Sequence, residues 1–354
     1  MTELKTRQPT GAVPWPLILV EGGEKAGKSW AAAVLSSSDK VGRTLWLDWG
    51  EGAADEYGAI PGARYEVIEH DGTWLSILGQ VRAAQKEAQR AVDAGEKPVV
   101  LVIDSMSAEW EDLKEWVDGK ARRRDKNRKA LERDPEAEIQ ITTDLWNQAT
   151  ARHKELMRVL MRFPGIVVMI ARGADQVAIE NGRPVEGKRV WKVEGQKNLA
   201  FDASVWVRFN RGEHPTIVGA RSVHAGIVPG EDKPKRWPDL TLEQLVFDVL
   251  KCDPKTAQVR DWATAQDRIG DLMDRIALAE SKDELTVLWR EAKAGDLLNM
   301  GLAEGATVNE AILARVEEIA MDAAREADEG ADAGEEDHQP AADAAPSEPT
   351  EQSA

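Results

Sequence analysis

A glycine-rich segment near the N-terminus carries the strongest chemical signal in this sequence. Residues 22–29 match the pattern G-x-x-x-x-G-K-[ST]. Glycines let a backbone wrap closely around phosphate oxygens, and the N–H groups that open the following helix face the anion. In this pattern Lys28 reaches the β- and γ-phosphates and Ser29 is a ligand of Mg²⁺, so the segment predicts a site for ATP and Mg²⁺. The residues that we expect at the nucleotide are Gly22, Gly23, Glu24, Lys25, Ala26, Gly27, Lys28, Ser29 and Trp30.

An apolar run that ends in a carboxylate supplies a second part of such a site. Residues 99–105 read Val-Val-Leu-Val-Ile-Asp-Ser. A carboxylate at the C-terminal edge of a sheet is well placed to support the metal ion of a bound nucleotide. We therefore expect Asp104, together with Ser29, to hold Mg²⁺. The alternative is that Asp104 only caps the helix after it.

Hydrolysis also needs a group that orients or deprotonates water. The apolar run 44–47 is followed by Asp48-Trp49-Gly50-Glu51-Gly52, which places two carboxylates in a glycine-rich turn. We favour Glu51 as the water-activating base, with Asp48 as the second candidate. The alternative is that either carboxylate only caps or solvates the turn. Lys28, Glu51 and Asp104 are thus the predicted catalytic residues.

Apolar runs and helical patterns alternate between residues 15 and 250. Such alternation predicts a mostly parallel sheet covered on both faces. The parallel strands are expected at residues 17–20, 44–47, 65–68, 99–103 and 166–170, and the helices at 28–37, 73–94, 109–117 and 144–162. Three further runs joined by short turns are expected to be antiparallel additions at the sheet edge, at residues 190–193, 204–209 and 216–219.

Composition and charge limit the class of protein. The 354 residues include 46 Lys or Arg and 63 Asp or Glu, and the net charge of −17 excludes a globally basic nucleic-acid binder while permitting a local basic groove. The one cysteine, Cys252, excludes a disulfide scaffold and a cysteine-based zinc site. No apolar run approaches the roughly 20 residues of a membrane helix, and no secretory signal is visible. We therefore expect a cytoplasmic protein that does not contact membranes.

The order of these motifs resembles the RecA-like ATPase core. The segment at 22–29, Leu-Asp-x-x-Glu at 47–51 and Val-Ile-Asp-Ser at 102–105 occur in the family's order. Residues 167–172 resemble the strand that carries the family's nucleotide-sensing residue, and residues 195–205 resemble the segment after its second DNA-binding loop. The resemblance covers residues 15–250. It implies an α/β RecA-like P-loop NTPase core whose ATP hydrolysis is stimulated by DNA.

Within this superfamily the chain is most similar to the short ATPases of bacteriophages that are grouped as phage nucleotide-binding or single-strand annealing proteins. Arg-Ser-Val-His at 221–224 and Thr-Leu-Glu-Gln-Leu at 241–245 are similar to the actinobacteriophage members. This resemblance implies an ATP-dependent recombination protein that binds single-stranded DNA in the host cytoplasm. The alternatives are a phage replication motor or helicase loader, and a nucleotide-gated adaptor with little hydrolysis.

Three arginines are candidates for sensing or completing the site. The sensor position carries Ala171 and Arg172, where recombinases commonly place Asn and Gln, so Arg172 is the sensor candidate. Arg208 and Arg211 are candidates for an arginine given to a neighbouring subunit. Only residues 1–14 precede the core, so we expect no N-terminal oligomerisation helix. The sequence does not distinguish between a ring, a filament and a monomer as the oligomeric state.

The first basic segment, residues 120–133, has eight Lys or Arg against two acidic residues. It lies where the RecA-like family has its first DNA loop, and its cations would neutralise DNA phosphates in a salt-sensitive way. A solvated helical excursion is the alternative. The candidate DNA contacts are Arg122, Arg123, Arg124, Lys126 and Arg128.

The second basic segment, residues 183–197, matches the position of the family's second DNA loop. A base can stack on Trp191 while the cations follow the backbone. The alternative is a sheet-edge hairpin in which Trp191 covers the core. The candidate DNA contacts are Lys188, Arg189, Trp191, Lys192 and Lys197.

The sequence divides into an N-terminal extension (1–14), the ATPase core (15–250), a helical appendage (256–325) and a tail (326–354). The appendage has apolar residues at helical spacing. The tail has ten acidic residues and no Lys or Arg, so we expect it to be disordered. It either competes with DNA for the basic groove, recruits a basic partner, or only keeps the protein in solution. The appendage and the tail are both candidate sites for a protein partner.

Overall fold

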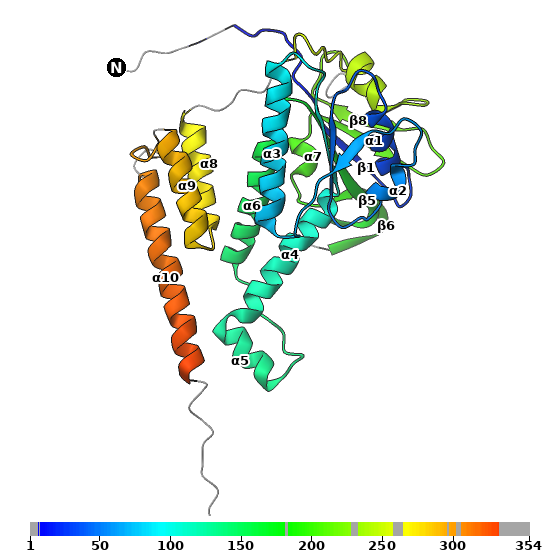
Figure 1. The fold of residues 1–354 in the computed structure, drawn as a ribbon. Helices are drawn as coiled ribbons and strands as arrows, with labels where there is room; N and C mark the ends of the chain where they lie inside the picture. Colours follow the sequence, from blue (N-terminus) through cyan, green and yellow to red (C-terminus); the bar gives the residue numbers. More distant parts are fainter. Residues whose placement is uncertain are drawn as a thin grey trace, which may run out of the picture. The chain divides into compact units, whose positions relative to one another are not determined.

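A central sheet organises the first of two structural units in this computed structural model (Figure 1). The structure describes residues 6, 8–180, 183–227, 233–257, 265–295, 297–301 and 306–332. Within these residues the sheet has nine strands in the order β3-β2-β4-β5-β1-β7-β8-β9, with β6 paired to β5. The strands are β1 (Leu17–Gly22), β2 (Thr44–Asp48), β3 (Tyr65–Val67), β4 (Val100–Asp104), β5 (Ile166–Glu180), β6 (Arg183–Glu194), β7 (Val205–Phe209), β8 (Thr216–Ala220) and β9 (Lys235–Arg236).

The pairing of the strands confirms the predicted fold class. Strands β1 to β5 and β7 pair in parallel. The prediction that residues 204–209 form an antiparallel edge strand is wrong, because β7 lies inside the sheet between β1 and β8 and pairs in parallel with β1. Strands β6, β8 and β9 are antiparallel additions. The parallel strands therefore end at one common edge, where the motif residues of β1, β2 and β4 meet.

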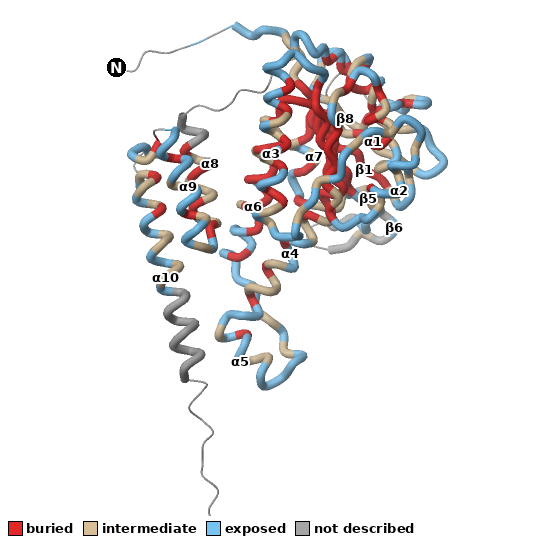
Figure 2. The backbone as a smooth tube through the Cα atoms, in the orientation of Figure 1, coloured by how far each residue is buried: buried red, intermediate tan, exposed pale blue. Residues whose placement is uncertain are grey.

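Helices cover both faces of the sheet, which explains why its strands are apolar without interruption. Ile18 and Val20 pack towards α1 (Lys28–Ser36). Their neighbours Leu17 and Leu19 pack towards α3 (Trp74–Asp93) and α6 (Thr143–Met161). Figure 1 shows these helices on opposite sides of the sheet, and Figure 2 shows the buried strands between them. The helices of this unit are α1 (Lys28–Ser36), α2 (Ala54–Tyr57), α3 (Trp74–Asp93), α4 (Met106–Arg123), α5 (Asp125–Arg133), α6 (Thr143–Met161), α7 (Leu199–Asp202) and a short π-helix at Gln244–Val249.

Several elements are longer than the sequence patterns predict, and two of these extensions matter for the site. Strand β5 continues beyond the expected residue 170 to Glu180, because it pairs with β6 after it leaves the parallel part of the sheet. Helix α4 begins at Met106 instead of residue 109, because the Ser105 side chain caps it by accepting a hydrogen bond from the N–H of Ala108. Both extensions bring side chains towards the carboxyl edge of the sheet.

The second unit, residues 264–354, contains α8 (Ala265–Leu278), α9 (Lys282–Ala294) and α10 (Val308–Asp332). Leu272, Leu288 and Ile312 belong to its apolar core. Helix α10 includes residues 326–332 of the predicted tail, and residues 333–354 lie outside the described residues. No helix in the described part of either unit is long and apolar enough to cross a membrane.

Candidate functional site

The loop at 22–29 joins the end of β1 to the start of α1, as the sequence predicts. Position 22 requires glycine because the backbone carbonyl of Phe209 lies so close that a Cβ atom would clash with it. Gly27 has φ 89°, a left-handed conformation that glycine adopts readily, and it caps α1. The Lys28 Nζ donates hydrogen bonds to the carbonyls of Gly22 (3.1 Å) and Gly23 (2.8 Å). Burial lowers the pKa of Lys28, and the nearby charges of Asp104 and Glu51 oppose that change.

Asp104 lies at the end of β4 and is almost fully buried. Burial raises its pKa to about 6, with Glu51 and Asp48 adding to the increase and a hydrogen bond from Ser29 opposing it. Its Oδ2 atom is buried without a hydrogen-bond partner in the part of the chain that the structure describes. An unpartnered carboxylate oxygen beside a serine hydroxyl fits the oxygen ligands that Mg²⁺ prefers. Ser29 and Asp104 would therefore hold the ion.

Glu51 follows β2 and points towards the same edge. Its Oε1 atom accepts hydrogen bonds from the Ser105 hydroxyl (2.8 Å) and the Arg172 guanidinium (2.9 Å). Burial alone would raise the pKa of Glu51, but these two hydrogen bonds and the charges of Arg172 and Lys28 together hold the pKa below its usual value. Asp48 instead accepts the backbone N–H groups of residues 51 and 52, so it shapes the turn that presents Glu51. The capping role considered for Asp48 is the one that the structure shows.

Arg172 lies directly across the sheet from Gly22, in the β5 register position next to the phosphate loop. Besides Glu51, the Arg172 guanidinium contacts Glu111 (3.4 Å). The backbone N–H of Arg172 donates a hydrogen bond to the hydroxyl of Ser107 (2.8 Å). The predicted sensor is thus in contact with the predicted base. Its role as a sensor stays a prediction.

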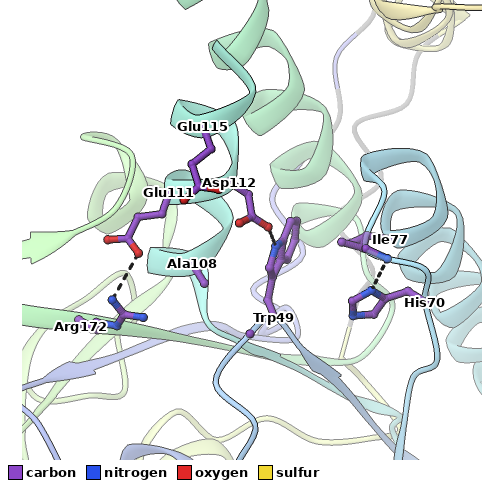
Figure 3. A pocket seen from close by; sticks show the side chains of 10 residues that line it. Trp49, His70, Ile77, Ala108, Glu111, Asp112, Glu115 and Arg172 are labelled. Atoms are coloured by element: carbon purple, nitrogen blue, oxygen red, sulfur yellow. Dashed lines mark hydrogen bonds and ion pairs between the residues drawn. The ribbon is translucent and has the colours of Figure 1, made fainter. Parts of the chain in front are cut away.

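Arg172 also lines a cavity of about 370 Å³ (Figure 3). Three carboxylates of α4 line it, namely Glu111, Asp112 and Glu115, and the indole N–H of Trp49 donates to Asp112. Because this lining is acidic, it would repel phosphates. Only Arg172 in this lining carries a fixed positive charge, so the cavity is a poor site for a phosphate group.

The two remaining arginine candidates have different surroundings. Arg208, on β7, is half-buried and donates through Nε to Glu21 (2.6 Å) within its own chain. Arg211 follows β7 in an exposed turn. Of the two, Arg211 is in the better position to reach a neighbouring copy.

The first basic segment forms the end of α4 and helix α5, which lie away from the sheet (Figure 1). Four of its five candidate side chains have partners in the same chain. Arg122 pairs with Asp118, Arg124 with Asp144, and Arg128 with Asp125, while Lys126 donates to Gln140. Arg123 is exposed. Three of the eight cations of this segment are therefore paired with carboxylates, a pattern that a solvated helical excursion also shows.

The second basic segment forms β6 and lines a groove of about 960 Å³ between β6, α4 and α7. Its aromatic lining is Trp110, Trp191, Phe201 and Trp206, and its charged lining is three lysines and two carboxylates, namely Lys114, Lys192, Lys197, Glu111 and Glu194. Phe201 is 80% exposed although it is a large apolar side chain. Arg189 is exposed on β6, and the side chain of Lys188 lies outside the described residues. Trp191 is half-buried and donates its indole N–H to Glu21 (2.7 Å), so it is part of a hairpin as well as of the groove.

Sequence reasoning missed four residues at this edge: Glu21, Trp110, Lys114 and Phe201. One signal was available for Glu21, because a charged residue that ends an apolar strand needs partners when it is buried. The other three lie on α4 and α7, and only the folded chain brings them beside β6. No local pattern marks such residues.

No family model matches the chain, and no curated protein matches its sequence. Among solved structures, the RadB recombinase is 14% identical with a TM-score of 0.34, over 59% of this chain and 83% of that one. An ATPase from the type III secretion system of pathogenic bacteria is 12% identical with a TM-score of 0.32, over 87% of this chain and 83% of that one. Because both TM-scores are low, the fold class stated above is based on the pairing of the chain's own strands.

Proposed function

We propose that this chain is a RecA-like ATPase that binds single-stranded DNA and acts in DNA recombination, as phage single-strand annealing proteins do. One observation supports this proposal above the others. Lys28, Glu51 and Asp104 converge at the carboxyl edge of the sheet, and an aromatic, lysine-lined groove opens beside that edge. The first set suits a nucleoside triphosphate, and the second suits unpaired bases and their phosphates.

In the proposed reaction each residue has a separate task. Lys28 stabilises the charge that develops on the transferred phosphoryl group. Glu51, ionised at neutral pH because its pKa is low, positions and activates the attacking water. Ser29 and Asp104 would hold Mg²⁺, which would neutralise charge on the phosphate oxygens.

The groove is our first choice for DNA. Bases would stack on exposed aromatic rings such as Phe201, and the lysines would follow the phosphates, so binding would weaken with salt. The segment around α5 is a weaker candidate, since three of its arginines, Arg122, Arg124 and Arg128, already pair with carboxylates of the same chain. Arg211 is the residue we propose to complete the site of a neighbouring copy.

A nucleotide-gated adaptor with little hydrolysis is the second candidate function. The contacts of Glu51 favour it, because Ser105 and Arg172 both donate to one oxygen of this carboxylate and compete with water for it. In such a protein the helices of residues 264–332 and the acidic tail would bind other proteins.

The groove predicts a clear effect of Phe201→Ala. Since a stacked base contributes about 1–3 kcal/mol, we expect oligo-dT binding to weaken by about 5- to 150-fold, with little change in melting temperature because the ring is exposed. Fluorescence anisotropy at two salt concentrations measures this effect. Val92→Ala on α3 is the matched control, because it also truncates an exposed apolar side chain. Equal binding by the two variants, without salt dependence, would place DNA outside this groove.

A further inference from the structure

Glu21 is a buried carboxylate between the phosphate loop and the groove. It is 0% exposed and directly precedes Gly22, the first residue of the loop. In the sheet it stands opposite Ala171 of β5 and Arg208 of β7. Any change in its surroundings therefore acts on the strand that carries the loop.

Three donors from the groove side converge on this one carboxylate. Its Oε2 accepts the indole N–H of Trp191 (2.7 Å). Its Oε1 accepts the indole N–H of Trp206 (3.0 Å) and the Nε–H of Arg208 (2.6 Å). The Arg208 guanidinium also lies 4.8 Å from the centre of the Trp191 ring. A buried carboxylate needs such partners, so it fixes the orientation of both rings that line the groove.

Gly173 makes this arrangement possible. It follows Arg172 on β5, and a Cβ atom at this position would come within 2.7 Å of the Trp191 ring and would clash with Glu21. The indole therefore packs directly against the β5 backbone. The position of Trp191 therefore depends on its hydrogen bond to Glu21 and on the absence of a side chain at Gly173, the residue after Arg172.

The phosphate side of Glu21 contains a bond that nucleotide binding must change. The Lys28 Nζ donates to the carbonyl of Gly22, the next residue, and to Gly23. The ammonium group has three N–H donors, and the phosphates of a nucleotide compete with these carbonyls for them. The negative charge of Glu21 also acts on Lys28, where it raises the pKa against the effect of burial.

We propose that Glu21 is a positioning residue that couples nucleotide binding at residues 22–29 to the orientation of Trp191 in the groove. The proposal rests on the proposed function of the two sites and adds how one regulates the other. When Lys28 turns from the Gly22 carbonyl to phosphate, the end of β1 shifts, and Glu21 carries the shift to the indole. Such coupling is reciprocal, so DNA in the groove strengthens nucleotide binding by the same factor.

The first test follows Trp191 directly, without DNA. The full chain is labelled with 5-fluorotryptophan, and its ¹⁹F NMR spectrum is recorded with and without Mg²⁺ and the ATP analogue AMP-PNP. Trp191→Phe assigns the resonance. We expect the Trp191 signal to shift on nucleotide addition in the wild type and to lose at least half of that shift in Glu21→Gln.

Glu66→Gln is the matched control. It removes the same charge from a carboxylate on β3 that is exposed and forms an ion pair with Arg43. The control should retain the full shift. A wild-type resonance that does not respond to nucleotide, or an equal response in Glu21→Gln, overturns the proposal. If Glu21→Gln does not fold, the same spectra of Arg208→Lys, which lacks the guanidinium contacts to this carboxylate, decide the question.

The second test measures the coupling itself. The dissociation constant for oligo-dT is measured with and without AMP-PNP, and its ratio in the wild type is expected to be at least about fivefold. In Glu21→Gln the ratio should fall towards one, and an unchanged ratio overturns the proposal. A wild type that binds no oligonucleotide in either state would refute the proposed function, whereas the ¹⁹F shifts would still show whether Glu21 connects the two sites.

Discussion

Replacing Glu51 with glutamine is expected to lower ATP turnover by about 10²- to 10⁴-fold, because the amide cannot accept a proton from water. Glutamine keeps the shape of the side chain and one oxygen that accepts hydrogen bonds from Ser105 and Arg172. Nucleotide affinity should therefore change by less than about threefold. Phosphate release measures the first effect, and calorimetry with AMP-PNP measures the second.

Glu111→Gln is the control for this experiment. Glu111 contacts the same arginine, Arg172, but belongs to the acidic cavity rather than to the turn after β2. We expect it to retain turnover within about threefold of the wild type. If Glu51→Gln also retains turnover, another group activates the water. If the wild type itself shows negligible turnover and Glu51→Gln keeps the biological function, the adaptor is the better description.

Asp104→Asn is expected to stabilise the protein while abolishing its activity. The pKa of Asp104 is raised in the folded state, from 3.8 to about 6, so the folded chain prefers the neutral acid. The wild type therefore loses stability as the pH rises from about 4 to above 6, and at pH 8 it bears the full cost of a buried charge. Asparagine removes that cost, which is about 3 kcal/mol at most. It also removes the charged ligand of Mg²⁺, so turnover should fall by about 100-fold or more.

Thermal melts between pH 4 and pH 8 without nucleotide test the stability part. We expect the Asp104→Asn melting temperature to exceed that of the wild type at pH 8 and to equal it near pH 4. Asp118→Asn, at a half-exposed carboxylate on α4, should change stability by less than about 0.5 kcal/mol throughout. An Asp104→Asn variant that is less stable than the wild type at pH 8 would show that the carboxylate has a structural partner.

The sequence predicts this fold well where a pattern is local. The phosphate loop, the apolar strands and the carboxylates after β2 and β4 are each visible within a few residues. Parallel pairing then brings Lys28, Glu51 and Asp104 to one edge without further information. The DNA contact that charge density predicts for residues 120–133 stays a prediction, and the local pattern does not reveal that Asp118 and Asp144, outside this segment, pair with Arg122 and Arg124.

The groove could not be predicted in the same way, because distant segments build it. From the sequence, Trp191 could either be available to a base or belong to a hairpin that covers the core. In the structure it lines the groove and is also held in the hairpin by its hydrogen bond to Glu21. The contact between Trp191 and Glu21 joins residues that are 170 positions apart. Gly173 matters because an indole packs on it, and a single glycine in a strand carries no signal of that kind.

ATP turnover with and without single-stranded DNA, at two salt concentrations and beside Lys28→Ala, is the most direct test of the account. Lys28 is the phosphate-loop residue that we place at the transferred phosphoryl group. The account predicts turnover that DNA stimulates, that salt weakens, and that Lys28→Ala loses. Turnover that is indifferent to DNA, in a protein that binds no DNA at low salt, would contradict it and would favour a motor, loader or adaptor acting through a protein partner.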